Sequence, residues 1–306
     1  MVFIVERGIK FLKKTTLYLL SLLFIAEILL FISSLSSISL ADGWVQQKGK
    51  GLFIGTFAIQ QFNGNDLSGQ YDKDKKIMQV QYLFYGEYGI TNRITLGGKM
   101  ILTDSFINSK NSWFKKADKQ SFAVDNTQIF MRFQIYRNKW LVLSYGSAIQ
   151  SPSVYKQNEA SAFSIKRWQY EQRMELGIAL GENNFFTAMF AYHGNIKHWY
   201  DEMHLDLTFG HYFIKELLMT IKFQKYFYLI NNTKKIRQAF GLTNLSLADY
   251  FSQHGFSKLT ISMIASVNEK TSFEFGFYST LKAKWLGTQY LNINMRGLYF
   301  SLWIWI

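Results

Sequence analysis

Alternation of apolar and polar residues with a period of two, repeated in stretches of about ten residues, limits the fold of this chain more than any other feature. In the stretch 168–180, "WQYEQRMELGIAL", one side carries Tyr170, Met174, Leu176, Ile178 and Leu180, and the other carries Gln169, Glu171, Arg173 and Glu175. Successive side chains of a β-strand point to opposite faces, so this pattern predicts a strand with one apolar and one charged face. After residue 41 no uninterrupted apolar window is long enough for a helical membrane span.

Stretches of this kind, twelve in all, follow one another along the chain. They lie near residues 52–60, 78–88, 94–102, 127–135, 140–149, 168–180, 186–192, 203–213, 217–227, 257–267 and 272–281, with a last one ending at Ile306. With an even number of antiparallel strands, both ends of the chain lie on the same side of a closed barrel. The barrel must close because an unpaired strand edge is too costly in lipid. The sequence therefore predicts an all-β fold, a transmembrane, antiparallel up-and-down β-barrel of about 12 strands.

The connections between these stretches alternate in length. Short ones rich in Asn, Lys and Glu are expected at 89–93, 137–139, 182–184, 214–216 and 268–271, and long polar ones at 62–76, 103–124, 151–166, 193–201, 228–256 and 283–290. Outer-membrane barrels have short periplasmic turns and long external loops, whereas a soluble sandwich has no such order and must bury its apolar faces against each other. The alternation favours the barrel.

The N-terminal segment has the features of an export signal. Basic residues are followed by a largely apolar run over 17–32, and Ser39-Leu40-Ala41 offers the small residues that a signal peptidase requires. We predict that residues 1–41 are a cleaved secretory signal and that residues 42–306 form the barrel in the outer membrane of a Gram-negative bacterium. The alternative is a retained anchor, which Glu27 disfavours because a carboxylate is costly inside a bilayer.

The last ten residues, "GLYFSLWIWI", are predicted to be the closing strand. Leu298, Phe300, Leu302, Ile304 and Ile306 are expected to face lipid, and Gly297, Ser301, Trp303 and Trp305 to face inward or lie at the rim. The ending "LWIWI" resembles the terminal strand by which proteobacterial outer-membrane barrels are recognised. That resemblance implies a contact between Leu302–Ile306 and the barrel assembly machinery.

Three further segments carry a narrower resemblance. "GWVQQKGKG" (43–51), "GEYGITNRITLGGK" (86–99) and "DEMHLDLTFG" (201–210) are similar to segments of the XagA-like proteins, a group of proteobacterial outer-membrane β-barrels. The likeness covers the strand framework of most of the chain after residue 41. It implies a location and a fold, and no catalytic or binding residues.

Charged residues recur on the polar side of the predicted strands and are our pore-lining candidates. These candidates are Lys99, Arg132, Glu171, Arg173, Glu175, His204, Asp206, Lys222 and Glu274. Charges in a dry interior are costly unless paired, so either water fills the lumen or an ionic network closes it. We expect a passive pore for small polar or ionic solutes, because no strand offers the uniformly large inward residues that a solid filling would need.

Two alternatives to a pore remain open at this stage. The chain is basic, with a formal net charge of +13, and Lys-rich or Arg-rich loops at 110–120, 197–199 and 232–238 suit a non-conducting structural or surface-interaction barrel that binds lipopolysaccharide or a partner. A barrel lipase or acyltransferase would need a serine near a histidine, and Ser144, Ser147 and Ser151 lack a recognisable motif. We read them as small lumen or loop residues.

No cofactor, metal or nucleic acid is expected. The absence of cysteine removes thiolate ligands and disulfides. The segment "HGNIKHWYDEMH" collects three histidines, but a metal site needs three or four ligands that converge. We read this segment as a polar barrel rim that faces water.

Overall fold

The computed structural model describes residues 45–63, 76–108, 119–155, 168–195, 200–230, 257–281 and 294–306. The predicted signal at 1–41 and the basic loop segments 110–118, 197–199 and 232–238 lie outside these residues. Within them no helix is long and apolar enough to cross a membrane.

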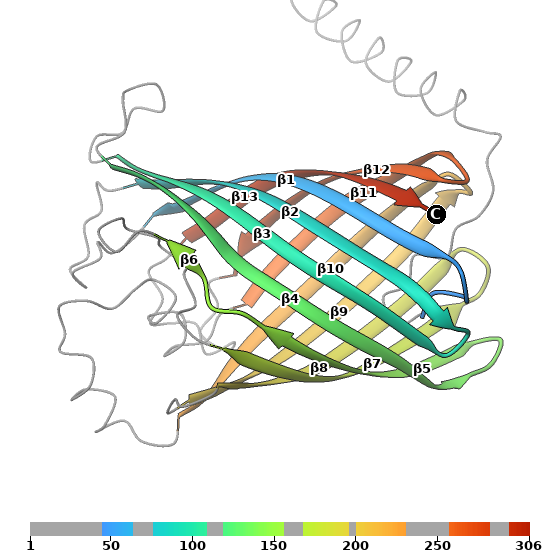
Figure 1. Ribbon diagram of the computed structural model, residues 1–306. Coiled ribbons are helices and arrows are strands. Elements are labelled where there is room, and N and C mark those ends of the chain that lie inside the picture. Colours follow the sequence, from blue (N-terminus) through green and yellow to red (C-terminus); the bar gives the residue numbers. More distant parts are fainter. Residues whose placement is uncertain are drawn as a thin grey trace, which may run out of the picture.

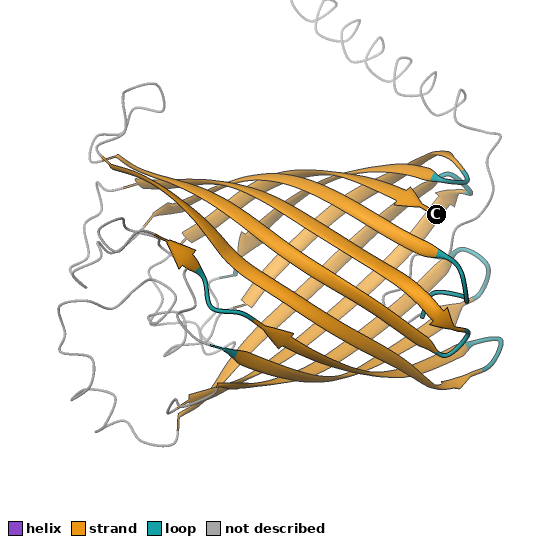
Figure 2. Cartoon of the chain, viewed as in Figure 1, coloured by secondary structure: helices purple, strands orange, loops and turns teal. Residues whose placement is uncertain are grey.

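The described residues form antiparallel strands that close into a barrel (Figures 1 and 2). The strands are β1 (Gly51–Asn63), β2 (Lys76–Thr91), β3 (Ile94–Asn108), β4 (Lys119–Arg137), β5 (Leu141–Gln150), β6 (Val154–Tyr155), β7 (Gln169–Leu180), β8 (Asn184–Asn195), β9 (Tyr200–Ile214), β10 (Leu217–Ile230), β11 (Ser257–Asn268), β12 (Thr271–Thr280) and β13 (Asn294–Trp305).

Twelve of these strands make the wall, each paired with its neighbours in an up-and-down order. β1 pairs with β13 over twelve residue pairs, from Leu52 opposite Trp305 to Asn63 opposite Asn294, and β3 pairs with β4, which closes the ring. The extra strand, β6, is two residues long and pairs only with β4. It follows β5 after a break that contains Pro152, the only proline of the chain, and proline cannot donate a ladder hydrogen bond.

Five tight turns join strands at one end of the barrel, which we call the turn end. They occupy residues 92–93, 138–140, 181–183, 215–216 and 269–270. Side chains fix them locally: Asn138 accepts hydrogen bonds from the backbone N–H groups of Trp140 and Leu141, both at 2.8 Å. The C-terminus lies at this same end (Figure 1). The twelve-strand barrel and the short turns are therefore as predicted.

Several strands extend further than the sequence pattern indicated. β3 continues to Asn108 and β4 begins at Lys119, inside the expected loop 103–124, and β8 and β9 leave only 196–199 between them. On β4 alternation fails as a guide because Asp125 is an extra residue: Ile101 pairs with Asn126 and Leu102 with Val124. A bulge of this kind inverts the side-chain pattern locally.

The outer surface of the barrel is apolar. Ile129, Phe275 and Leu298 expose 67%, 57% and 51% of their surface, although each stands in the middle of a strand. Exposed apolar area of this extent is unfavourable in water and favourable in a lipid bilayer. The closing strand follows the prediction: Leu298, Phe300, Ile304 and Ile306 are exposed, while Gly297 and Ser301 are buried on the inner side.

Candidate functional site

The inner wall of the barrel is polar and charged. All nine residues singled out from the sequence lie on this wall, from β3 (Lys99), β4 (Arg132), β7 (Glu171, Arg173, Glu175), β9 (His204, Asp206), β10 (Lys222) and β12 (Glu274). The structure brings seven of them into two neighbouring clusters, and Lys99 comes from the wall opposite the second cluster. Glu274 stands apart and accepts hydrogen bonds from Tyr299 Oη and Trp303 Nε1 at 2.8 and 3.1 Å.

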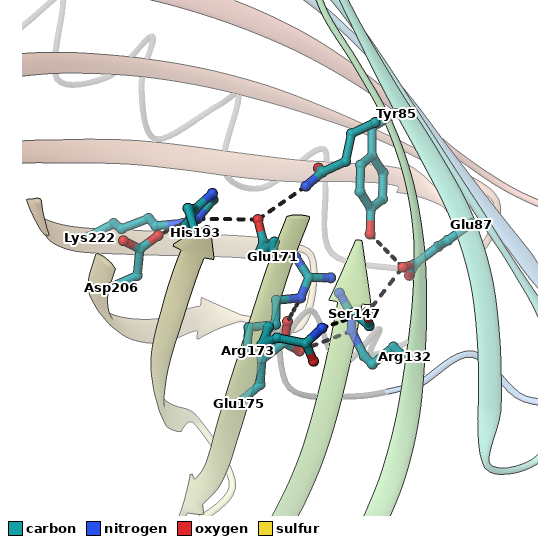
Figure 3. A network of polar contacts seen from close by, with 12 residues as sticks. Tyr85, Glu87, Arg132, Ser147, Glu171, Arg173, Glu175, His193, Asp206 and Lys222 are labelled. Atoms are coloured by element: carbon teal, nitrogen blue, oxygen red, sulfur yellow. Dashed lines mark hydrogen bonds and ion pairs between the residues drawn. The ribbon is translucent and has the colours of Figure 1, made fainter. Parts of the chain in front are cut away.

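The first cluster is a series of linked ion pairs that we call the arginine network (Figure 3). Arg132 Nη1 lies 3.5 Å from Glu87 Oε2 on β2, and Arg132 Nε lies 3.0 Å from Glu175 Oε2 on β7. Arg173 continues the chain, with Nε 2.8 Å from Glu175 Oε1 and Nη1 3.3 Å from Glu171 Oε1. Charges therefore alternate in sign along the arginine network. This pairing offsets the free-energy cost of burying them.

Polar and aromatic side chains hold the arginine network in place. Gln128 donates to Glu171 Oε2 at 3.1 Å, and Tyr85 donates to Glu87 Oε2 at 2.5 Å. The Phe130 ring lies between the two guanidinium groups, 5.9 Å from that of Arg132 and 5.1 Å from that of Arg173. Arginine stacks on aromatic faces in this way because its charge is delocalised over a plane.

The network lies along the wall because the strands between its members carry small residues. On β5, which separates β4 from β7, the inward residues Ser144, Gly146 and Ala148 are almost fully buried. A Cβ atom at Gly146 would stand 2.6 Å from Arg173 Nε, which is too close for any real side chain. Arg173 therefore crosses the wall over a bare backbone, and its charge stays near the wall.

The second cluster lies on β8, β9 and β10. Asp206 Oδ2 accepts from Lys222 Nζ at 3.0 Å and from Gln224 Nε2 at 2.9 Å. Beside it, the His193 and His204 rings have centroids 4.3 Å apart, and His204 packs edge-on against Tyr226 at 3.8 Å. His193 Nε2 is 3.4 Å from Glu171, so the two clusters meet.

The N-terminal described residues enter the turn end of the lumen, and we call residues 45–50 the mouth segment. The Gln46 backbone N–H donates to Thr95 Oγ1 at 2.8 Å, and Gln46 Nε2 donates to Glu87 Oε1 at 2.5 Å. A Cβ atom at Gly89 would lie 2.1 Å from the Gln47 carbonyl oxygen, so only glycine permits this approach. The mouth segment is thereby tied directly to the arginine network.

An apolar cluster occupies the other side of the turn end. Phe185, Leu218 and Ile264 are buried together, with Tyr212 and Trp303 against them. These inward side chains and the mouth segment occupy part of the lumen at the turn end.

Two readings of the sequence need correction. His193 was assigned to a rim facing water, but it lies on the inner face of β8 with 8% of its surface exposed. Ser147 was assigned to the lumen or a loop, but it faces outward and accepts a hydrogen bond from Gln172 at 3.1 Å. Ser144 does face the lumen, and Ser151 follows β5 as a connecting residue. Among the described residues no group of three or more potential ligands is arranged to hold a metal.

Sequence reasoning missed several members of the site. Lys258 borders the second cluster, because it pairs with Gln224, the residue of β10 that donates to Asp206. It stands at the start of β11 on the polar side of an alternating stretch, so the same pattern would have found it. Gln46 and Phe130 could not be found in this way, because the mouth segment lies outside the strands and Phe130 is an apolar residue on a polar face.

Together the apolar exterior, the polar interior and the closed antiparallel ring define the fold of an outer-membrane β-barrel. A crystal structure of the COG4313 outer membrane channel from Pseudomonas putida F1 is similar to this chain, with a TM-score of 0.62 and 11% identity over 88% of this chain and 100% of that chain. At this identity the likeness shows the fold alone.

More distant structural neighbours are barrels as well. The KdgM porin matches with a TM-score of 0.44 and 7% identity over 81% of this chain and 97% of its own. The Pseudomonas putida toluene transporter TodX matches with a TM-score of 0.40 and 6% identity over 90% and 98%. Both are too remote to inform the site. No protein-family model and no curated protein matches the sequence.

Proposed function

We propose that the protein is a passive outer-membrane channel for small polar or ionic solutes. The observation that carries the proposal is the course of the arginine network along the wall. Its long side chains lie over Ser144, Gly146 and Ala148 of β5 and pair with each other around the barrel wall. In this proposal the axis of the barrel is therefore left to solvent. The similarity in fold to the COG4313 outer membrane channel is consistent with this function.

Efflux from proteoliposomes tests this proposal. Vesicles loaded with small sugars and amino acids of increasing size should lose the smaller solutes faster when they contain the protein. Retention of every solute, with protein insertion confirmed by protease protection, would contradict the proposal.

A second candidate function is a structural or surface-interaction barrel that conducts nothing. The observation that favours it is the turn end, where the mouth segment and the apolar cluster around Leu218 narrow the lumen. In that case the basic loops would bind lipopolysaccharide or a partner, and removing them would abolish binding. In a channel the same deletion would leave efflux largely intact. The neighbouring channel folds give only weak support to a non-enzymatic role, and a barrel hydrolase ranks third.

The proposed location rests on the same fold. In this account residues 1–41 direct export and are removed, Leu302–Ile306 engages the barrel assembly machinery, and the XagA-like proteins are relatives. The exposed side chains of Ile304 and Ile306 suit a terminal strand in contact with lipid. Sequencing the N-terminus of the protein from isolated outer membranes tests the export step, and a start at Met1 would contradict it.

A further inference from the structure

Beside the second cluster lie two hydroxyl groups for which the described residues offer no hydrogen-bond partner. On the inner face, Thr208, Lys222 and Thr260 form one row across β9, β10 and β11, since Lys222 pairs with Thr208 on one side and Thr260 on the other. Both threonines are 8% exposed, and among the described residues neither hydroxyl oxygen has a hydrogen-bond partner. Buried hydroxyl groups normally find one, so this row has donors to spare.

Two further lysines, Lys258 and Lys99, lie near this row. Lys258 stands opposite Gln224, which places it diagonally beside Lys222 at about 7–8 Å between Cα atoms. Lys99 comes from β3, which is six strands from β10 in both directions around the ring and therefore on the opposite wall. Even so, its ammonium group interacts electrostatically with Glu171, Arg173, Lys222 and Asp206, in that order of strength.

Near this row the carboxylates have donors, whereas two lysines have no ion pair with a described carboxylate, and this difference favours an anion. Asp206 has Lys222 and Gln224 as donors, and Glu171 has Arg173, Gln128 and His193. In contrast, the Lys258 ammonium lies 5.1 Å from the centroid of the Tyr278 ring, and no described carboxylate forms an ion pair with Lys258 or Lys99. The Lys258 and Lys99 ammonium groups, which come from opposite walls and lack an ion pair with a described carboxylate, repel each other. An anion between them relieves that repulsion.

We propose that Lys222, Lys258, Thr208 and Thr260 bind the carboxylate or phosphate group of a small anionic solute, with Lys99 facing it from the opposite wall. Asp206 serves as a positioning residue that holds the Lys222 ammonium at the wall. The inference rests on the proposed channel function and specifies the charge class of the solute. Ammonium and hydroxyl donors in neighbouring positions on three strands match the several acceptor oxygens of such a group.

Selectivity in planar bilayers tests the site. Under a tenfold KCl gradient the unmodified protein should pass chloride in preference to potassium. Each of Lys99→Gln and Lys258→Gln should lower the chloride-to-potassium permeability ratio about 10- to 20-fold. One unit charge about 5 Å from an ion in a water-like dielectric is worth about a factor of four, and it acts in opposite directions on chloride and potassium. Lys215→Gln and Lys270→Gln, which lie in turns, are the matched controls and should leave the ratio unchanged.

Block of the chloride current identifies the ligand chemistry. Inorganic phosphate and acetate are added separately, and block by one of them alone assigns the site to that group. Thr260→Val keeps the shape of the side chain and all charges, so it should weaken the block without altering the permeability ratio. Heat-modifiable mobility on gels confirms that each variant is folded.

Failure of the channel function and failure of the anion site give different results. An inserted protein that passes no current removes the channel function and this site with it. A protein that conducts, but whose selectivity and block are the same in Lys99→Gln, Lys258→Gln and the two turn variants, overturns the anion site and leaves the channel.

Discussion

Replacing Arg132 by Met should destabilise the barrel more than any single change of charge in a turn. Arg132 lies between Glu87 at 3.5 Å and Glu175 at 3.0 Å, and the side chains are 8%, 4% and 4% exposed. Removing one partner of a buried pair leaves an uncompensated charge, which costs about 3–5 kcal/mol. Met keeps the volume and the contact with Phe130, so the loss reports on charge.

Urea unfolding of the protein in lipid vesicles, followed by tryptophan fluorescence, measures this effect. At a slope of about 2–3 kcal/mol per molar urea, the midpoint should fall by about 1–2 M. The double variant Arg132→Met/Glu87→Gln should recover about 1–2 kcal/mol, since among the described residues Glu87 has no other ion pair, whereas Glu175 keeps Arg173 at 2.8 Å. Lys139→Met, in an exposed turn, should change stability by less than about 0.5 kcal/mol. Equal midpoints for Arg132→Met and Lys139→Met would refute the arginine network as a source of stability.

Three further predictions concern the wall, the turn end and the outer face. Gly146→Val should displace Arg173, whose Nε stands 2.6 Å from the new Cβ position, and both a lower urea midpoint and altered conductance are expected in bilayers; wild-type behaviour in both would contradict the proposed path of Arg173. Gln46→Ala removes the side-chain amide that donates to Glu87, and hydrogen exchange of the mouth segment should become faster while the strands stay protected; unchanged exchange would show that this contact does not hold the segment. Phe275→Lys, in the middle of β12 and 57% exposed, should cost about 2–4 kcal/mol in lipid, and a smaller cost would place that surface outside the hydrocarbon layer.

Much of the inner wall could be predicted because side chains alternate strictly along a strand. Glu171, Arg173 and Glu175 were assigned to one face from spacing alone, and the structure places all three on the inner wall. The assignment needed no knowledge of the neighbouring strands. Ser147 shows the limit: an outward polar residue in a short, small-residue strand looks like a lumen residue until its partner Gln172 is known.

The contacts between strands could not be predicted in the same way. Arg132 and Glu175 are joined across β5, and their approach depends on the register of two strand pairs and on the missing side chain at Gly146. Register is a property of the closed ring, which no single stretch contains. The turn between two strands fixes their register locally, but a bulge such as that at Asp125 of β4 shifts it by one residue.

The most direct test of the account is the conductance of the full chain, purified from the membrane and inserted into planar bilayers. A polar lumen with its arginines along the wall predicts discrete current steps that grow with salt concentration. A silent membrane, with insertion confirmed independently, would contradict the channel and transfer the function to the surface of the barrel.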